Sequence, residues 1–129
     1  MSNDLLLDTN TAIALLKQEP KPLRRLASAG KVYVPSIVLG ELYYGAYKSA
    51  QVAQNVAKTD LVARGNTILY CDAATARIYG AIKAGVRAKG RPIPDNDLWI
   101  AALAIQHQLT LLTRDAHFEQ VESLSLERW

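Results

Sequence analysis

Three observations predict an α/β fold with a parallel central sheet of about four to five strands. Short runs of apolar, β-branched or aromatic residues alternate along the chain with longer segments typical of helices. Gly and Pro separate many of these runs, at points where a helix ends or cannot continue. The 129 residues show no repeat or linker, so we expect a single domain over residues 1–129. Strands that alternate with helices favour parallel pairing.

The first half of the chain is expected to hold two strands and four helices. The apolar run Leu5-Leu6-Leu7 is typical of a short buried strand, and Asp8 can cap the helix after it. Pro20 and Pro22 break the chain before the second helix, which Gly30 ends. The expected elements are a strand at 5–7, helices ending near 17 and at about 23–29, a strand at 31–34, and helices at about 36–49 and 50–64.

The second half repeats this alternation. Gly90 stops a long Ala-rich helix, and the two prolines of the following segment keep it extended. Asp95 or Asn96 is expected to cap the next helix. The expected elements are strands at 67–70 and 109–112, helices at 73–89 and from 95 or 96 to about 107, a helical turn at 115–118 and an edge strand at 123–126.

Composition narrows the setting of the protein. The single Cys71 excludes an internal disulfide and fits a reducing compartment. No signal-peptide pattern opens the chain, and no apolar run is long enough for a membrane helix, so we expect a cytoplasmic protein without a membrane partner. There is also no glycine-rich phosphate loop, and the two histidines lack the spacing of a zinc site.

Positive charge gathers in one stretch of a chain whose net charge is only +3. Between Asp72 and Asp95 there is no acidic residue, whereas Arg77, Lys83, Arg87, Lys89 and Arg91 carry positive charge. Such a stretch attracts a polyanion or is merely a solvated helix face, and charge alone favours the second interpretation.

Four of the twelve acidic residues interrupt or end apolar segments. They are Asp8, Glu41, Asp97 and Asp115. Asp8 and Asp115 follow strands, and the carboxyl ends of parallel strands are where ligands bind in such sheets. Each of these two can instead be a plain helix cap, and Asp97 can simply complement a helix dipole.

Glu41 has no comparable local explanation. Its neighbours one helical turn away are uncharged, so we expect a buried or half-buried carboxylate without a basic partner on its own helix. If the four carboxylates converge, they repel one another, and a divalent cation removes that penalty. All-oxygen ligation suits Mg²⁺ or Mn²⁺, which activates water for attack on a phosphodiester.

Four segments resemble the motifs of PIN-domain ribonucleases, and within that superfamily the chain is most similar to toxins of the VapC type. The segments are Leu7-Asp8-Thr9-Asn10, Ser36-Ile37-Val38-Leu39-Gly40-Glu41-Leu42, Asp97-Leu98-Trp99-Ile100-Ala101-Ala102 and Thr113-Arg114-Asp115. The resemblance covers essentially the whole chain, down to Glu127-Arg128-Trp129.

The resemblance implies a three-layer sandwich with helices on both faces of the sheet and an endoribonuclease that depends on Mg²⁺ or Mn²⁺. It places the family's catalytic, metal-binding acids on Asp8, Glu41, Asp97 and Asp115, with Thr9, Asn10 and Thr113 as supporting polar residues. It also implies an RNA substrate, a homodimer and a VapB-type antitoxin whose C-terminal tail blocks the site. Lys83, Arg87, Lys89 and Arg91 are the candidates for contacts with the RNA backbone.

Other interpretations remain open from the sequence. Asp95 lies two residues before Asp97, but on a helix it points about 200° away, so both are not expected to bind one cation. The alternatives to a toxin are an RNA-processing nuclease of the same fold, a non-catalytic RNA-binding module and a phosphate-accepting receiver domain. The last needs a Lys after the final core strand, where this chain has Thr113-Arg114-Asp115.

Overall fold

A five-stranded parallel sheet forms the centre of the protein. The computed structural model describes residues 3–129. The strands are β1 (Leu5–Leu7), β2 (Val32–Pro35), β3 (Thr67–Leu69), β4 (Thr110–Thr113) and β5 (Leu126–Arg128), in the order β3-β2-β1-β4-β5. Every neighbouring pair is parallel. The predicted α/β class and parallel sheet are therefore confirmed.

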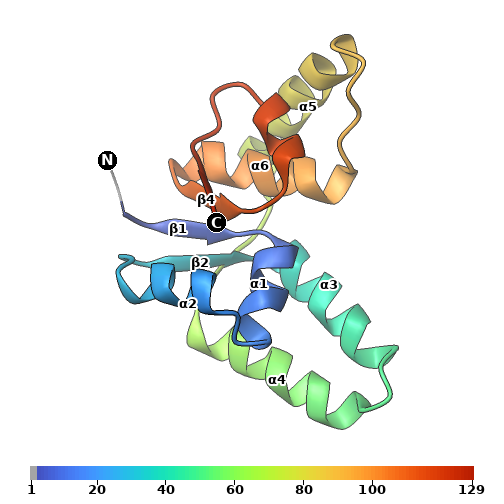
Figure 1. The fold of residues 1–129 in the computed structure, drawn as a ribbon. Helices are drawn as coiled ribbons and strands as arrows, with labels where there is room; N and C mark the ends of the chain where they lie inside the picture. The colour runs from blue at the N-terminus through green and yellow to red at the C-terminus, as the bar shows by residue number, and fades with distance from the viewer. Residues whose placement is uncertain (1–2) are drawn as a thin grey trace.

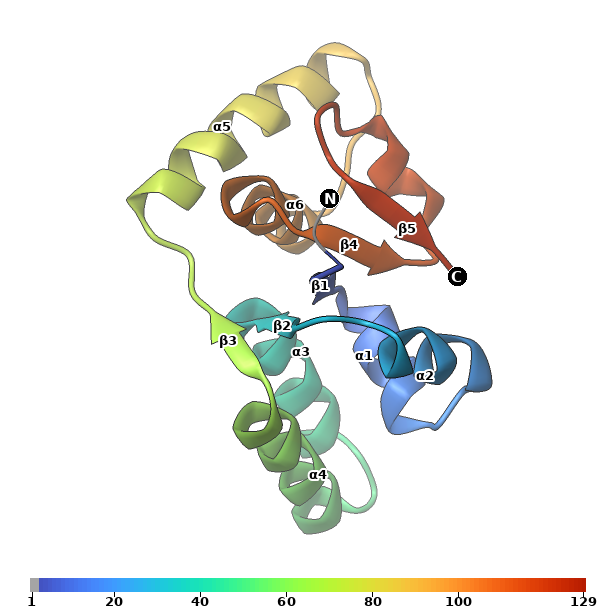
Figure 2. The same ribbon diagram turned by 90° about the vertical axis from the view of Figure 1, so that its left-hand side faces the viewer.

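Helices cover both faces of this sheet. They are α1 (Thr9–Leu16), α2 (Pro20–Ala27), α3 (Ser36–Tyr47), α4 (Val52–Gly65), α5 (Ala73–Ala88) and α6 (Asp95–His107), with a 3₁₀ helix, η1 (Ala116–Gln120), after β4. Figures 1 and 2 show α1 to α4 on one side of the strands and α5 and α6 on the other. This is the three-layer arrangement that the resemblance implied. Within residues 3–129, no helix combines the length and apolar character needed to cross a membrane.

The core lies around the two central strands, β1 and β4. All three residues of β1 are buried, as are Leu111 and Leu112 of β4. Helix α6 presses a fully buried run, Ile100–Ala104, against the sheet. Strands buried on both faces carry continuous apolar sequence, which explains why the Leu5–Leu7 run identified β1 directly.

Several expected boundaries shift in the structure, and those of α2, α6 and β5 have a clear physical reason. Helix α2 begins at Pro20 rather than near residue 23, because proline fits the first turn of a helix, where its missing N–H leaves no bond unmade. The cap of α6 is Pro94, and Asp95 is already its first helical residue. Strand β5 covers Leu126–Arg128 rather than residues 123–126. It takes its register from β4, with Leu111 opposite Leu126 and Thr113 opposite Arg128.

Candidate active site

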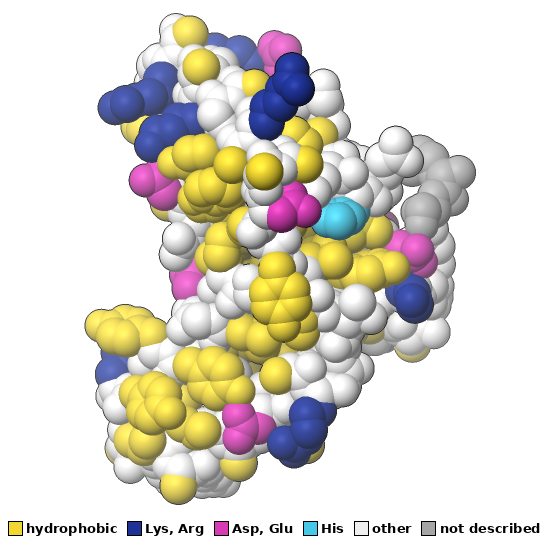
Figure 3. Space-filling view, turned by 180° about the vertical axis from the view of Figure 1, so that it is seen from behind, with side chains coloured by type: hydrophobic (Ala, Val, Ile, Leu, Met, Phe, Trp, Pro, Cys, Tyr) yellow, Lys and Arg dark blue, Asp and Glu magenta, His cyan; other side chains and the backbone are white. Residues whose placement is uncertain are grey.

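The four unusual acids line one cleft at the carboxyl end of the sheet. Asp8 directly follows β1, and Asp115 lies two residues beyond the neighbouring β4. Glu41 comes from α3, which follows β2, and Asp97 from the first turn of α6. All four border a cleft of about 480 Å³, together with Thr9, Asn10, Pro94, Asp95, Asn96 and His117. Figure 3 shows the molecule hollowed between its upper and lower parts.

Asp8 is held on both carboxylate oxygens. Its side chain is 1% exposed. Oδ1 accepts the backbone N–H of Thr11 at 2.9 Å, which is a helix cap of the expected kind. Oδ2 accepts the hydroxyl of Thr113 at 2.5 Å, across from β4. Capping and a place in the cleft are thus combined in one residue, rather than being alternatives.

Glu41 is half-buried, as its uncharged surroundings on the helix predicted. Its Oε1 accepts the hydroxyl of Thr9 at 2.6 Å. No Lys or Arg forms an ion pair with Glu41 in the part of the chain that the structure describes. A half-buried carboxylate without an ion-pair partner is the kind of group that a bound cation stabilises.

Asp97 is affected by the other acids. Burial raises the pKa of its carboxyl, and the charges of Asp8 and Glu41 raise it further. His117 acts in the opposite direction and lowers the pKa of Asp97, since its Nε2 lies 2.9 Å from Asp97 Oδ2. The side chain is 20% exposed, so the group is partly screened by solvent. Charge repulsion between acids from β1, α3 and α6 is therefore present in the folded protein.

Asp115 completes the set through polar neighbours. Its Oδ2 accepts the side-chain amide of Asn10 at 2.9 Å, and its backbone N–H donates to Thr113 Oγ1 at 3.0 Å. Thr113 thus connects Asp115 with Asp8. The three polar residues of the sequence motifs all contact the acids: Thr9 contacts Glu41, Asn10 contacts Asp115, and Thr113 contacts both Asp8 and Asp115.

Asp95 and Asp97 have different partners although both border the cleft. Asp95 Oδ1 accepts Lys83 Nζ at 2.9 Å and the hydroxyl of Tyr79 at 2.8 Å. These two bonds lower the pKa of Asp95, with Lys83 as the larger cause. Asp95 is therefore an exposed carboxylate already neutralised at the rim, whereas Asp97 faces the other acids.

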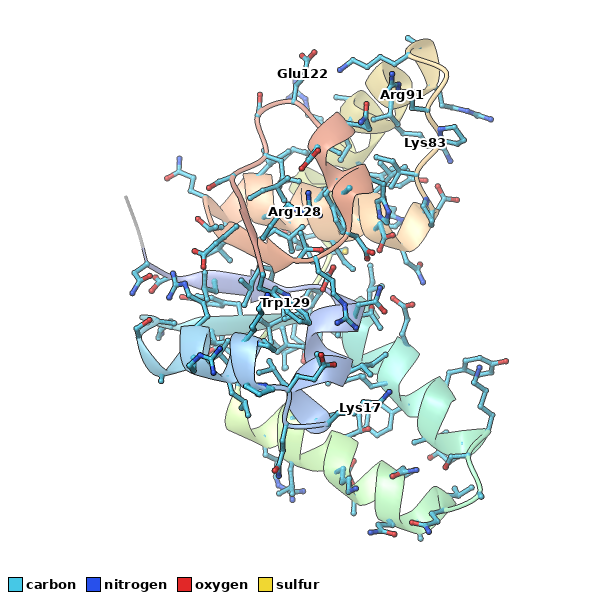
Figure 4. All side chains as sticks on the ribbon, in the orientation of Figure 1. Lys17, Lys83, Arg91, Glu122, Arg128 and Trp129 are labelled. Carbon is cyan, nitrogen blue, oxygen red and sulfur yellow. The ribbon has the colours of Figure 1, made fainter. Side chains whose placement is uncertain are left out.

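The basic candidates for RNA contacts divide into paired and unpaired residues. Lys83 is paired with Asp95, and Lys89 with Glu122 at 3.0 Å. Arg87 and Arg91 are exposed, and the structure gives neither an ion pair among residues 3–129. Figure 4 shows Lys83 and Arg91 on the α5 side of the molecule. The two arginines, which form no ion pair among residues 3–129, are therefore better candidates for phosphate binding than the two paired lysines.

Sequence reasoning missed His117 as part of this cleft. It was weighed only as a zinc ligand, whereas the structure places it against Asp97. Its position two residues after Asp115, in the turn that begins η1, was the available signal. Asn96 was considered only as a helix cap, and it too borders the cleft.

The donor set fits a hard divalent cation. The cleft offers carboxylate, hydroxyl and amide oxygens, which suit Mg²⁺ or Mn²⁺. Over residues 3–129, no three or more His, Cys, Asp or Glu side chains lie close enough together to hold a metal ion as they stand. Mg²⁺ usually keeps several waters and takes only one or two carboxylates directly, so an open cleft with spaced acids is compatible with it.

The fold and the cleft define a class: an α/β protein with acids at the carboxyl ends of its parallel strands. Comparison with known proteins identifies the family. The model of the PIN domain matches residues 5–124. Ribonuclease VapC2 of Haemophilus influenzae is 38% identical over 127 residues, which cover 96% of each chain. The tRNA(fMet)-specific endonuclease VapC of Shigella flexneri is 35% identical over the same shares.

Solved structures agree with this result. VapBC2 of Rickettsia felis, bound to a DNA fragment from the promoter, matches with a TM-score of 0.88 at 33% identity, over 98% of each chain. DNA-bound VapBC of Salmonella typhimurium matches with a TM-score of 0.89 at 31% identity, over 100% of this chain and 99% of the other. The chain belongs to the PIN-domain family, among its VapC ribonucleases.

Proposed function

We propose that the protein is the toxin of a toxin–antitoxin pair and cleaves RNA phosphodiester bonds with Mg²⁺ or Mn²⁺, the whole chain acting as one PIN domain. The observation that carries this proposal is the single cleft bordered by Asp8, Glu41, Asp97 and Asp115. The relatives named as ribonucleases support the reaction class. The cytoplasmic location expected from the sequence stays a prediction.

Asp8, Glu41 and Asp97 would hold the cation directly or through water, and Asp115 would complete the shell or contribute to a second site. Bound there, a divalent cation supplies a Lewis acid for the phosphoryl oxygen and a water of lowered pKa. The chain's own polar residues orient these acids. Thr113 fixes Asp8, Thr9 fixes Glu41 and Asn10 fixes Asp115.

The substrate is grasped by groups outside the acid cluster. Arg87 and Arg91 are exposed and without an ion pair in residues 3–129, so they can bind the RNA backbone without breaking an ion pair. Lys83 forms an ion pair with Asp95, and Lys89 forms one with Glu122. Either lysine has to give up or share its carboxylate partner to bind a phosphate. We therefore assign the larger share of phosphate binding to the two arginines.

The proposed partners are a VapB-type antitoxin and a second copy of the chain. The solved relatives of Rickettsia felis and Salmonella typhimurium are VapBC assemblies, which supports the antitoxin. On α3 and α4 the side chains of Tyr44, Tyr47 and Leu61 are between 61% and 66% exposed. Large apolar residues left exposed on two helices that pack together support a protein contact there.

The test is cleavage of cellular RNA by the purified chain. Brief expression followed by mapping of new RNA ends gives the target, and Asp8→Asn is the control because asparagine preserves the helix cap while removing the charge. We expect Mg²⁺- or Mn²⁺-dependent ends with the parent only. Robust cleavage by a nuclease-free preparation of Asp8→Asn would contradict the proposal.

A further inference from the structure

We propose that Trp129 is a positioning residue of the acid-lined cleft, which fixes Asp8 through the two threonines that hold its carboxylate. This inference rests on the proposed cation site at Asp8. Trp129 is not among the residues that line the cleft, and its hydrogen bonds go to Thr11 and Thr113. Its influence has to pass through Thr11 and Thr113.

Both threonines hold Asp8 from buried positions. The Thr11 N–H donates to Oδ1 at 2.9 Å, and the Thr113 hydroxyl donates to Oδ2 at 2.5 Å. Thr11 and Thr113 are each 0% exposed. Both threonines therefore depend mainly on protein groups as hydrogen-bond partners.

Trp129 contacts each of these threonines. Its indole Nε1–H donates to Thr11 Oγ1 at 2.9 Å, and its backbone N–H donates to the carbonyl of Thr113 at 3.2 Å. Thr11 Oγ1 uses its own hydrogen for the carbonyl of Leu112, at 2.9 Å. The Thr11 hydroxyl is thus fixed between β4 and the indole, and Figure 4 shows Trp129 beside α1.

The indole is itself held in place by the neighbouring strands. The guanidinium of Arg114 lies 4.6 Å from the centre of the Trp129 ring. Arg128, which precedes Trp129, lies in register with Thr113 in the β4–β5 pair. Thr113 therefore holds the backbone of Trp129, and Arg114, the next residue along the chain, packs over its ring.

Loss of the indole N–H leaves a buried acceptor on Thr11 without this donor. The predicted consequence is a looser Asp8 carboxylate and weaker cation binding, with no change to any group that touches the cation. A single neutral hydrogen bond corresponds to about a fivefold change in an equilibrium constant. We expect Trp129→Phe to weaken Mn²⁺ binding measurably and by at most about this factor.

The experiment measures the Mn²⁺ dissociation constant of the full chain by calorimetry for the parent, Trp129→Phe, Thr11→Val and the double variant. If the indole acts through Thr11, Trp129→Phe has no further effect in the Thr11→Val background. Glu127→Gln is the matched control, because it removes the ion pair of β5 with Arg25 on α2 but leaves both threonine contacts intact. We expect it to keep Mn²⁺ binding within about twofold of the parent, with at most a small effect on the unfolding temperature.

The outcomes separate this inference from the function on which it rests. If the parent binds no Mn²⁺, or Asp8→Asn binds it equally well, the proposed cation site is wrong. If the parent binds Mn²⁺ and Trp129→Phe matches it, only the role of Trp129 is wrong. Additive effects of Trp129→Phe and Thr11→Val overturn the route through Thr11.

Amide hydrogen exchange of the metal-free protein is a second readout that needs no cation. The Thr11 amide donates to the Asp8 side chain, whereas the Ala12 amide donates to the Asp8 backbone carbonyl at 3.0 Å. We expect Trp129→Phe to speed exchange at Thr11 more than at Ala12. Equal acceleration at both amides indicates fraying of α1 and contradicts a specific effect on the carboxylate.

Discussion

Two aspartates in this protein occupy the same local structure and have different roles. Asp8 caps α1 and Asp72 caps α5, each accepts the backbone N–H of a threonine three residues later, and each of those threonines is 0% exposed. Asp72 is exposed and closes a full capping box with Thr75, while Gln106 adds a further donor at 3.0 Å. Asp8 is buried beside other acids.

The difference shows how a cap is distinguished from a site. The pKa of Asp72 is lowered, chiefly by the backbone N–H of Thr75 and then by Gln106, so its charge is favoured where it lies. In the cleft, burial and neighbouring charge raise the pKa of Asp97. A carboxylate such as Asp72, with hydrogen-bond donors beside it, stabilises its helix. Carboxylates that repel one another, as in the cleft, are stabilised by a bound cation.

The largest expected effect is a difference in RNA cleavage rate between two variants, each of which removes the charge of one capping aspartate. Asparagine keeps either cap, so Asp8→Asn and Asp72→Asn differ only in the site they belong to. We expect Asp8→Asn to lower the cleavage rate by more than about a hundredfold, the upper range for residues that support a metal site. Asp72→Asn should remain close to the parent. Equal losses in the two variants would break the distinction.

The pH dependence of stability should have opposite sign at the two places. Asp97 has a pKa above the ordinary value of 3.8, so its folded form binds a proton more tightly than the unfolded chain does. Its contribution to stability therefore falls as pH rises from 3.8 through the raised pKa. Asp72 has a lowered pKa, and its contribution is present above 3.8 and lost as pH falls through the lowered value.

The measurement is urea unfolding of the metal-free parent and variants as a function of pH, from below 3.8 up to pH 7, with a chelator present in the samples at neutral pH. At neutral pH, Asp97→Asn should be more stable than the parent, because a disfavoured charge is gone. Asp72→Asn should be less stable, because a favoured one is gone. Lower stability of Asp97→Asn would mean that its bond with His117 outweighs burial and repulsion.

The smallest expected effect is that of the cap itself. Asp72→Ala removes the acceptor for the Thr75 N–H, so the unfolding temperature should drop by a few degrees more than in Asp72→Asn. Thermal unfolding followed by circular dichroism measures this difference. RNA cleavage below the unfolding temperature should be unchanged. An Asp72→Ala variant that folds but no longer cleaves would place Asp72 in the functional site after all.

The sequence was informative where local chemistry decides the structure. Continuous apolar runs predicted β1 and β4, and acids at their ends predicted the edge where the cleft lies. Asp8 and Asp72 have the same cap pattern, an Asp followed three residues later by Thr. This pattern does not distinguish them, and in the sequence only the family resemblance does. Their difference depends on neighbours brought in by the sheet, such as Thr113.

Long-range pairing was beyond local reasoning. Strand β5 is the charged segment Leu126-Glu127-Arg128, whose pairing comes from β4 rather than from its own composition. The contact of His117 with Asp97 joins residues 20 positions apart, and that of Lys83 with Asp95 joins two helices. Only packing of α6 against the sheet and against α5 produces these contacts.

Cation-dependent stabilisation of the matched pair tests the central claim most directly. A ligand at 100 times its dissociation constant stabilises the folded state by about 2.7 kcal/mol. With saturating Mg²⁺, the parent and Asp72→Asn should both unfold at a higher temperature than in chelator, whereas Asp8→Asn should show little change. An equal rise in Asp8→Asn, or none in the parent, would contradict a cation site built on Asp8.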